Sequence, residues 1–417
     1  MTEGKVNSPV NVVIMGSIFI GWGGGLDLLR NVLNALSIKN EDFPTNLYLV
    51  LPDNSFLALV RRCVSFAWYF TKCLLNHQRP TLSFEPALNH SAVFDSLRNI
   101  KGEFKTIYYN GTQYSLKRAL RKVNASVLMF CTYAPSKSFP FPWVGYIADF
   151  QHKYYPEFFS QQEISSRDIY FEHTVNLSTT LIVNSQAVKS DIERFYPDHR
   201  TAIFVLPFTP IPIRSWFDPP QEDILDKYGL PKQYFVISNQ FWVHKDHKTA
   251  FEALAVLHKK TGKKDIKIVC TGKMEDFRFP DYISDLKMKI AQLDLNESII
   301  FLGYIPKLDQ VQIMKNSIAV IQPTLFEGGP GGGAIYDSVA LGIPSIVSDI
   351  PVNLEAHDHS VHLFRVGDSL DLADKMMMIA SQEKRYPTFD TQFAASRVRF
   401  EKYVDTIINS IKHALQR

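Results

Sequence analysis

The stretch from Phe326 to Pro344 constrains the fold of this chain most strongly. It reads FEGGPGGGAIYDSVALGIP and holds five glycines and a proline between Gly328 and Gly333. An apolar run, IAVIQPT, precedes it and a run with helical spacing follows, so the pattern predicts a strand, a glycine loop and a helix. Glycines let backbone N–H groups come close to a phosphate, and the start of a helix favours negative charge. We therefore expect an anion-binding loop here.

Apolar runs that we predict to be strands alternate with helical stretches in two successive halves of the chain. This alternation predicts parallel sheets built from strand–helix–strand units. In the first half the runs lie at 11–20, 47–52, 106–110, 126–132, 180–185 and 201–208. In the second half they lie at 234–239, 266–272, 299–305, 318–324 and 344–349. A proline-rich linker at 207–230 separates the halves, and an amphipathic helix at 397–417 ends the chain.

The balance of charge limits the classes of partner. The 417 residues include 45 basic and 42 acidic side chains, a formal net charge of +3, which does not suit nucleic acid as the main partner. The four cysteines form no CxxC pair and nothing at the N-terminus resembles a signal peptide, so we expect reduced thiols and a cytoplasmic protein. No Asp-x-Asp motif lies near the glycine loop, and we expect no metal or other cofactor.

Residues 56–75 have a composition that leaves two interpretations open. The sequence FLALVRRCVSFAWYFTKCLL mixes large apolar side chains with three basic ones. It fits either an interfacial helix at a membrane surface or a core helix whose basic side chains reach solvent. The first interpretation predicts a peripheral contact with the inner face of a membrane. No uncharged apolar run of about 18 residues exists, so we expect no spanning helix.

Two carboxylates flank the glycine loop, Glu327 before it and Asp337 in the predicted helix after it. Carboxylates accept hydrogen bonds from sugar hydroxyls, whereas a carboxylate beside a pyrophosphate repels it. We therefore expect the two acids to face hydroxyls on either side of a bound diphosphate. The glycines Gly331, Gly332 and Gly333 are expected to contact the diphosphate itself.

These residues resemble the GT-B-fold, retaining glycosyltransferases of family four. The family signature is Glu-x7-Glu followed by an Ala-rich helix and Gly-x-Pro, and Glu327 begins it here while Asp337-Ser-Val-Ala-Leu-Gly342-Ile-Pro344 matches its second half. The loop is longer by two residues and Asp337 replaces the second glutamate. The resemblance implies an α/β chain with two Rossmann-like domains facing across a cleft. It places an acceptor domain at 1–207, a donor domain at 208–395 and a helix at 396–417 that returns to the first domain.

The resemblance also implies roles for individual residues. Glu327 contacts the donor sugar, and Asp337 contacts the ribose hydroxyls. Lys245 neutralises the diphosphate, with Gln240 where arginine is usual, and His244 or Lys248 is a candidate to compensate for the lost guanidinium. The other donor-site and catalytic positions that the resemblance implies are Gly272, Lys273, Tyr304 and Ile305 from the second domain and His152 from the first. Gly23 and Gly24, in the GWGGG run before the first predicted helix, are expected to meet the diphosphate from the opposite wall.

These expectations define one leading function and two alternatives. The leading one is a metal-independent hexosyltransferase-type enzyme that moves a sugar from a nucleotide diphosphate donor to a glycan or lipid-linked acceptor with retention. The resemblance suggests cell-surface polysaccharide biosynthesis, such as O-antigen, capsule or exopolysaccharide. The alternatives are a nucleotide-sugar epimerase of the same architecture and a catalytically weakened nucleotide-sugar-binding relative. A dehydrogenase is disfavoured, because Leu26 stands where the GxGxxG fingerprint requires glycine.

Overall fold

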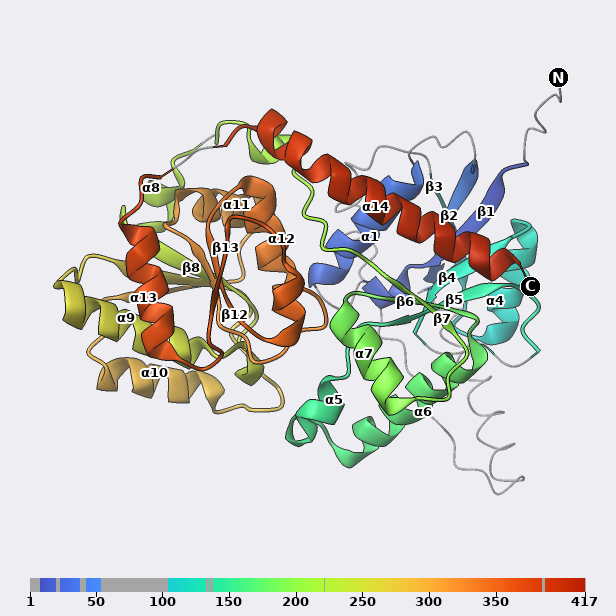
Figure 1. Cartoon of the computed structure of the whole chain (residues 1–417), viewed down its shortest axis with the longest axis horizontal. Helices are drawn as coiled ribbons and strands as arrows, with labels where there is room; N and C mark the ends of the chain where they lie inside the picture. Colours follow the sequence, from blue (N-terminus) through green and yellow to red (C-terminus); the bar gives the residue numbers. More distant parts are fainter. Residues whose placement is uncertain are drawn as a thin grey trace.

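A computed structural model describes residues 8–19, 23–37, 43–53, 104–132, 135, 138–220, 222–384 and 387–416. They form two α/β domains side by side, with the last helix running from the second domain across the first (Figure 1). Residues 56–75, for which we expected either a membrane-facing or a core helix, lie outside the described residues. No helix within the described ranges is long and apolar enough to cross a membrane.

The first domain is built on a seven-stranded parallel sheet with the order β3-β2-β1-β4-β5-β6-β7. Strands β4, β5 and β6 are buried along their whole length and β1 over its last four residues, as parallel strands covered on both faces require. The strands are β1 (Val10–Met15), β2 (Thr45–Pro52), β3 (Phe104–Tyr109), β4 (Val127–Cys131), β5 (Trp143–Ile147), β6 (Thr180–Val183) and β7 (Ala202–Val205).

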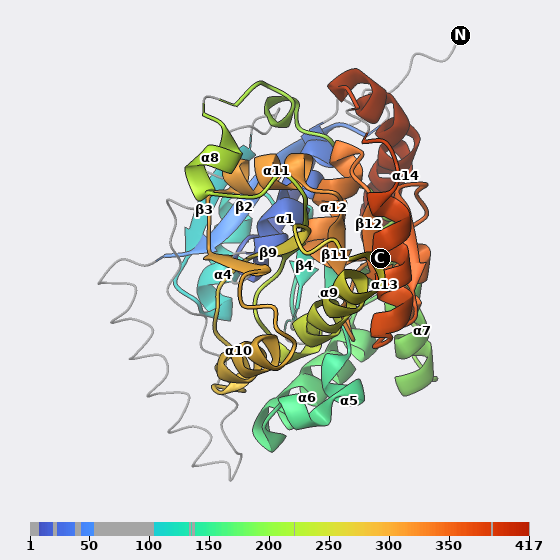
Figure 2. The ribbon, with the colours of Figure 1, turned by 90° about the vertical axis from the view of Figure 1, so that its left-hand side faces the viewer.

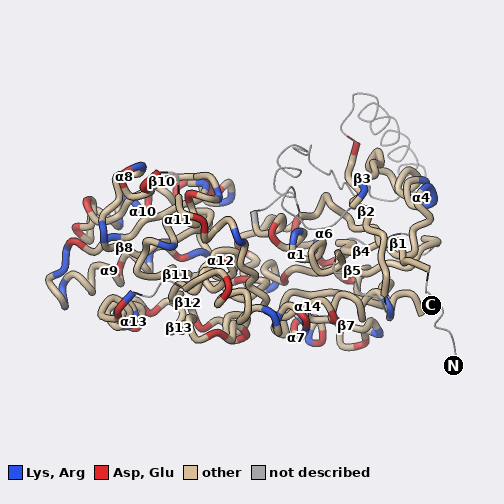
Figure 3. The backbone as a smooth tube through the Cα atoms, turned by 90° about the horizontal axis from the view of Figure 1, so that it is seen from above, with Lys and Arg blue, Asp and Glu red and all other residues tan. Residues whose placement is uncertain are grey.

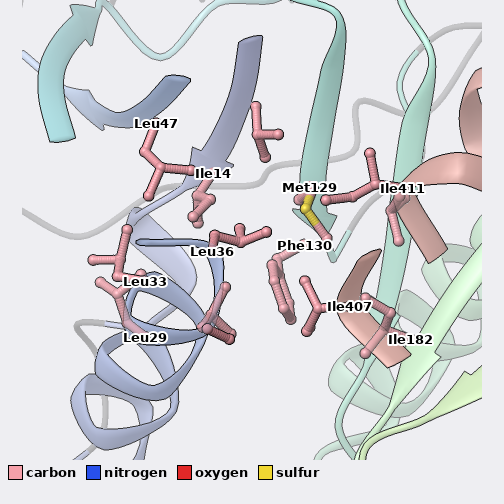
Figure 4. Close-up of a cluster of buried hydrophobic side chains, with 14 of the residues drawn as sticks. Ile14, Leu29, Leu33, Leu36, Leu47, Met129, Phe130, Ile182, Ile407 and Ile411 are labelled. Atoms are coloured by element: carbon pink, nitrogen blue, oxygen red, sulfur yellow. The ribbon is translucent and has the colours of Figure 1, made fainter. Parts of the chain in front are cut away.

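Helices cover both faces of this sheet. One face packs against α1 (Gly23–Ser37) and α14 (Phe389–Leu415), and the other against α4 (Gln113–Lys122), α6 (Gln161–Leu177) and α7 (Gln186–Phe195). Figure 4 shows the first of these cores, where side chains of α1 meet Phe130 and, from α14, Ile407 and Ile411. The predicted return of the last helix to the first domain is confirmed, although α14 begins eight residues before the predicted 397.

The second domain repeats the plan with a six-stranded parallel sheet, β10-β9-β8-β11-β12-β13. Its strands are β8 (Tyr234–Ser238), β9 (Lys267–Thr271), β10 (Ile299–Gly303), β11 (Val320–Gln322), β12 (Ser345–Ser348) and β13 (Val361–Phe364). One face packs against α9 (His247–Thr261), α10 (Tyr282–Gln292) and α13 (Ser369–Ala380). The other packs against α8 (Ile224–Tyr228), α11 (Lys307–Asn316) and α12 (Gly332–Leu341). Figure 2 shows this domain in front of the first.

The strand orders mark where a ligand belongs in each domain. In the first sheet the chain order reverses between β1 and β4, and in the second between β8 and β11. Open parallel sheets bind ligands outside the carboxyl ends of the strands at such a reversal. The loops after β1, β8 and β11 are therefore the expected ligand-binding loops. Basic and acidic residues are interspersed along both domains (Figure 3), as the near-neutral net charge of the sequence leads one to expect.

Candidate active site

Lys245 and Glu327 meet at the strand-order reversal of the second sheet. Lys245 ends η4 (Val243–Lys245), the turn after β8, and Glu327 lies in the loop after β11. The Lys245 ammonium donates a hydrogen bond to the Glu327 carboxylate, and the two side chains are only 11% and 13% exposed. Two residues assigned to the donor from the sequence are thus brought into direct contact.

Uncharged side chains hold the Glu327 carboxylate in place. Gln322, the last residue of β11, donates from Nε2 to Oε1 of Glu327 at 2.9 Å. Its own amide oxygen accepts a hydrogen bond of 2.5 Å from Nδ2 of Asn239. The backbone carbonyl of His244 accepts from Thr324 Oγ1 at 3.1 Å and from the Leu325 amide at 2.8 Å. These bonds tie the loops after β8 and β11 into one unit.

The glycine loop opens α12 in a way that only glycine permits. Gly331, the N-cap, and Gly332, the first helical residue, have φ of +65° and +62°. A Cβ on Gly331 would lie 2.4 Å from the Ile335 side chain. The N-cap has no side chain to accept from the first-turn N–H groups, and a Cβ on Gly332 would lie 3.2 Å from Oε1 of Glu327. Glu327 therefore sits at the positive start of α12.

A second helix start faces this one from the first domain. α1 begins at Gly23, and the Cα of Gly24 lies 4.0 Å from the position that a Cβ would take on Gly333. The approach is close elsewhere in the loop too, because a Cβ on Gly328 would lie 2.3 Å from the carbonyl oxygen of Ala148. The structure therefore brings the two predicted glycine segments together, although Gly21 and Trp22 lie outside the described residues.

Asp337 lies inside α12 and is held by a cation that we did not predict. Lys307, the first residue of α11, places its ammonium 2.5 Å from Oδ2 of Asp337 and 3.6 Å from Oδ2 of Asp27 on α1. Burial raises the pKa of Asp337 above its ordinary value, and the Lys307 ammonium opposes that rise. Burial lowers the pKa of Lys307, but the carboxylates of Asp337 and Asp27 outweigh it and leave that pKa raised.

The remaining positions assigned near the donor are arranged around the ends of β8 and β9. Gly272 has a φ of +131°, and a Cβ there would lie 2.0 Å from the carbonyl oxygen of Asn239. Gln240 is half-buried next to this contact, whereas Lys273 is exposed and pairs with Glu275. The close packing against Asn239 thus explains why residue 272 is glycine, whereas Lys273 lies on the surface.

The turn assigned to the base has one exposed and one buried residue. Tyr304 is 86% exposed, whereas Ile305 packs into the core beneath α11 and α12. The backbone of this turn is fixed by a hydrogen bond of 2.8 Å from the Gly272 amide to the Gly303 carbonyl. Tyr304 is therefore the side chain of this turn that is open to solvent.

The structure places His152 away from this group of residues. Its ring is buried in α5 (Gln151–Tyr154), stacked on Phe150 and edge-on to Phe171, and its Nε2 lies 2.9 Å from Oδ1 of Asp168. Burial lowers its pKa below the ordinary value, against the opposing effect of Asp168. In the same loop, the Cβ of Asp149 lies 2.9 Å from the Cβ position of Gly328, while its Oδ1 accepts from the Gln151 amide at 2.9 Å.

His244 and Lys248 were the candidates to compensate for the arginine that Gln240 replaces. Neither is placed as a charged neighbour of the glycine loop. His244 is buried, and burial together with the nearby Lys245 and Arg278 lowers its pKa to about 2, so its ring is neutral at neutral pH. Lys248 is exposed on α9. No group of three or more His, Cys, Asp or Glu in the described part of the chain is arranged to hold a metal ion.

The two domains are also joined directly beside the glycine loop. The carboxylate of Glu355, in η5 (Pro351–Glu355) of the second domain, accepts from the amides of Gln186 and Ala187 at 2.8 and 2.9 Å. These are the first two residues of α7, so Glu355 supplies the negative charge that a helix start favours. Ser185, the N-cap of α7, donates to the Gly328 carbonyl at 3.2 Å.

Several residues of the site were not predicted from the sequence. Lys307 and Asn353, whose Oδ1 accepts from the Gly331 amide at 2.7 Å, support the glycine loop and α12 from other elements. Gln322 had a usable signal, because it is a polar residue at the carboxyl end of an apolar run. The other residues missed are Asp27, Arg30, Asn239 and Glu355.

Comparisons with known proteins agree with this architecture. Residues 220–393 match the model of the family described as glycosyl transferases group 1. HepE of Anabaena, solved with UDP and glucose, is 16% identical with a TM-score of 0.63, and the match covers 97% of this chain and 100% of that one. Sucrose-phosphate synthase of Thermosynechococcus elongatus is 14% identical with a TM-score of 0.59, covering 98% and 97% of the two chains.

A third solved structure extends the same likeness. WaaG, a glycosyltransferase involved in lipopolysaccharide biosynthesis, is 10% identical with a TM-score of 0.54, and the match covers 95% of each chain. No curated protein matches this chain in sequence. The likeness runs along nearly the whole chain, so the predicted fold class is confirmed. The chain has the GT-B fold, and the part that matches glycosyl transferases group 1 is its second domain.

Proposed function

We propose that this protein is a retaining glycosyltransferase that moves a sugar from a nucleoside diphosphate donor to a glycan or lipid-linked acceptor. The observation that carries the proposal is the buried Lys245–Glu327 pair at the start of α12, with the glycine-rich start of α1 opposite. The match of residues 220–393 to glycosyl transferases group 1 supports it, as do the UDP and glucose bound by HepE.

The proposed chemistry follows from the charges of this site. Glycosyl transfer needs stabilisation of the negative charge that develops on the departing diphosphate. The Lys245 ammonium and the starts of α1 and α12 supply positive charge toward one point. Glu327 then accepts hydrogen bonds from the sugar hydroxyls, and Asp337 accepts from the ribose. Gln240 is a neutral contact in this scheme, and Gly272 and Tyr304 lie toward the nucleoside.

Finer parts of the proposal rest on the family resemblance. They are retention without a protein nucleophile, independence of metals, and a place in cell-surface polysaccharide biosynthesis on the cytoplasmic side of a membrane. His152 keeps its predicted role only if its ring leaves the pocket formed by Phe150 and Phe171. Asp149, whose Cβ lies next to Gly328, is the alternative candidate from that segment.

The test begins with a thermal-shift screen of the full chain against UDP-, GDP-, ADP- and dTDP-sugars. A donor that binds the native state raises the unfolding temperature. The stabilising donor is then incubated with a panel of glycan and lipid-linked acceptors, and nucleotide release and labelled product are measured together. Acceptor-dependent product with a retained anomeric configuration supports the proposal. Altered sugar released without an acceptor would show an epimerase, and donor binding without turnover would show a binding relative.

A further inference from the structure

Three parts of the molecule meet at Lys307. Its ammonium lies 2.5 Å from Oδ2 of Asp337 on α12 and 3.6 Å from Oδ2 of Asp27 on α1. It also lies 5.5 Å from the ring centre of Trp216 in η3 (Arg214–Trp216), within the segment between the two sheets. One ammonium therefore contacts the proposed ribose acid, the opposite domain and the interdomain segment.

The charges around Lys307 alternate in sign across the domain boundary. On α1, Arg30 pairs with Asp27 at 2.7 Å, and Lys307 then bridges from Asp27 to Asp337. The Asp337 side chain is only 6% exposed, whereas those of Asp27 and Lys307 are 30% and 37% exposed. A buried carboxylate that loses its cation is left uncompensated and tends to take up a proton. Lys307 thus keeps Asp337 in its ionised form.

Lys307 uses one oxygen of Asp337 and leaves the other available. The ammonium bonds to Oδ2, and this is the one hydrogen bond of the Asp337 side chain within the described part of the chain. An ionised carboxylate oxygen accepts hydrogen bonds only, so Oδ1 is suited to a hydroxyl and not to a phosphate. The aspartate side chain is short, and the bond to Lys307 fixes where that oxygen points.

We propose that Lys307 is a positioning residue that sets the preference of this site for a nucleotide whose ribose carries its hydroxyls. The proposal rests on the function proposed above. Lys307 holds Asp337 ionised through Oδ2, so that Oδ1 accepts from the ribose diol. Because the same ammonium faces Asp27 on α1, the residue that orients the ribose acid also contributes to contact between the domains.

The experiment measures two affinities for each variant of the full chain by titration calorimetry. The ligands are UDP, GDP and ADP and their 2′,3′-dideoxy counterparts, which lack both hydroxyls. For the base that binds, the wild type is expected to favour the ribonucleotide by about 10-fold or more, because a site built for a hydroxyl rejects an analogue without it. Lys307→Met is expected to bring the ratio of the ribonucleotide affinity to the dideoxynucleotide affinity close to one. Lys307→Arg is expected to retain most of the wild-type ratio.

A matched control comes from another lysine, on α8, that pairs with α11. Lys227 pairs with Asp309, two residues after Lys307, at 3.0 Å. Lys227→Met removes an ion pair to α11 without touching Asp337, and it is expected to keep the wild-type ratio. If Lys307→Met does not fold, the same two affinities are measured for Lys307→Gln, which keeps a hydrogen-bond donor but removes the charge.

The outcomes separate this proposal from the function on which it rests. A Lys307→Met protein that binds with the wild-type ratio overturns the role of Lys307 and leaves the proposed function in place. A wild type that binds none of the three ribonucleotides overturns the role of Lys307, whereas the proposed function falls only if the dTDP-sugars of the screen above do not bind either. If Lys227→Met loses the affinity ratio as fully as Lys307→Met does, the role of Lys307 is also overturned, because both changes would then act by disturbing α11.

Discussion

The ammonium of Lys245 donates a hydrogen bond to the carboxylate of Glu327, although 82 residues separate them in the sequence. The pair exists because β8 and β11 are neighbours at the strand-order reversal and each residue lies in the loop that follows its strand. With the starts of α1 and α12 close by, the pair concentrates opposite charges where the two domains meet.

Replacing Lys245 by methionine should weaken binding of the nucleoside diphosphate. The change removes a charge-assisted hydrogen bond and leaves Glu327 uncompensated beside the phosphates, at a cost of about 2 kcal/mol, or roughly 30-fold in affinity. Calorimetric titration with the diphosphate measures it. Lys248→Met, which removes an exposed lysine three residues on, is the control and should bind as the wild type does. Equal affinity in the two variants would contradict the role of Lys245.

The two first glycines of the loop should respond differently to alanine. A Cβ on Gly328 would lie 2.3 Å from the Ala148 carbonyl oxygen, whereas on Gly329 the nearest atom, of Asn184, is 3.5 Å away. Gly328→Ala should therefore force the two domains apart and reduce transfer by an order of magnitude or more, a loss of about 1.4 kcal/mol or more in transition-state binding. Gly329→Ala should leave the rate nearly unchanged. Steady-state kinetics with the donor checks both, and similar rates would show that the close approach does not matter for turnover.

Glu355→Gln should loosen the contact between the domains. Glu355 caps α7 across the boundary with two hydrogen bonds, and removing a charge at a helix start costs about 1 kcal/mol or less. The radius of gyration in solution should rise, and KM for the donor should increase more than kcat falls. Glu401→Gln removes a surface pair with Arg397 on α14 and serves as the control. An unchanged scattering profile and an unchanged KM in Glu355→Gln would show that Glu355 does not hold the two domains together.

His247 should make the fold less stable in mild acid. Its ring is fully buried and stacks on Phe241 with centroids 4.3 Å apart, and burial lowers its pKa to about 3. At a pH between about 3 and the unfolded-state pKa near 6.5, the imidazole is protonated in the unfolded chain but not in the folded one. The free energy of unfolding therefore falls as the pH drops through this range. The loss reaches about 2 kcal/mol at pH 5.

His247→Phe keeps a stacked ring and removes the titrating group. Urea unfolding of the wild type and the variant at about pH 7 and pH 5 measures the difference. The wild type should lose about 2 kcal/mol more than the variant between these conditions. An equal loss in both would mean that His247 is not the group responsible.

Much of the fold could be predicted because local patterns determine it. The apolar runs at 47–52, 126–132 and 234–239 all became strands, and the loop at 328–333 does open a helix. The strand β13 was missed because its four residues, VHLF, are too few and too mixed for a periodic signal. The first eight residues of α14 were missed because they are mostly exposed and show little apolar pattern.

The site was harder to predict because its partners come from distant elements. Glu327 and Lys245 followed from motifs, but nothing in the sequence near Lys307 shows that it faces Asp337 and Asp27. Such pairs depend on how α11, α12 and α1 pack. The case of His152 is similar, because a histidine after a strand can face either the loop or the core. Here Phe150, just before α5, and Phe171 on α6 pack against the ring.

We infer that Glu327 binds the sugar of a nucleoside diphosphate donor, and the rate of sugar transfer by Glu327→Ala tests this role. Glu275→Ala, which removes an exposed carboxylate of the same domain, is the control. We predict that Glu327→Ala lowers kcat by about 100-fold or more while the free nucleoside diphosphate binds within a few-fold of the wild-type affinity. Transfer at the wild-type rate by Glu327→Ala would contradict this role.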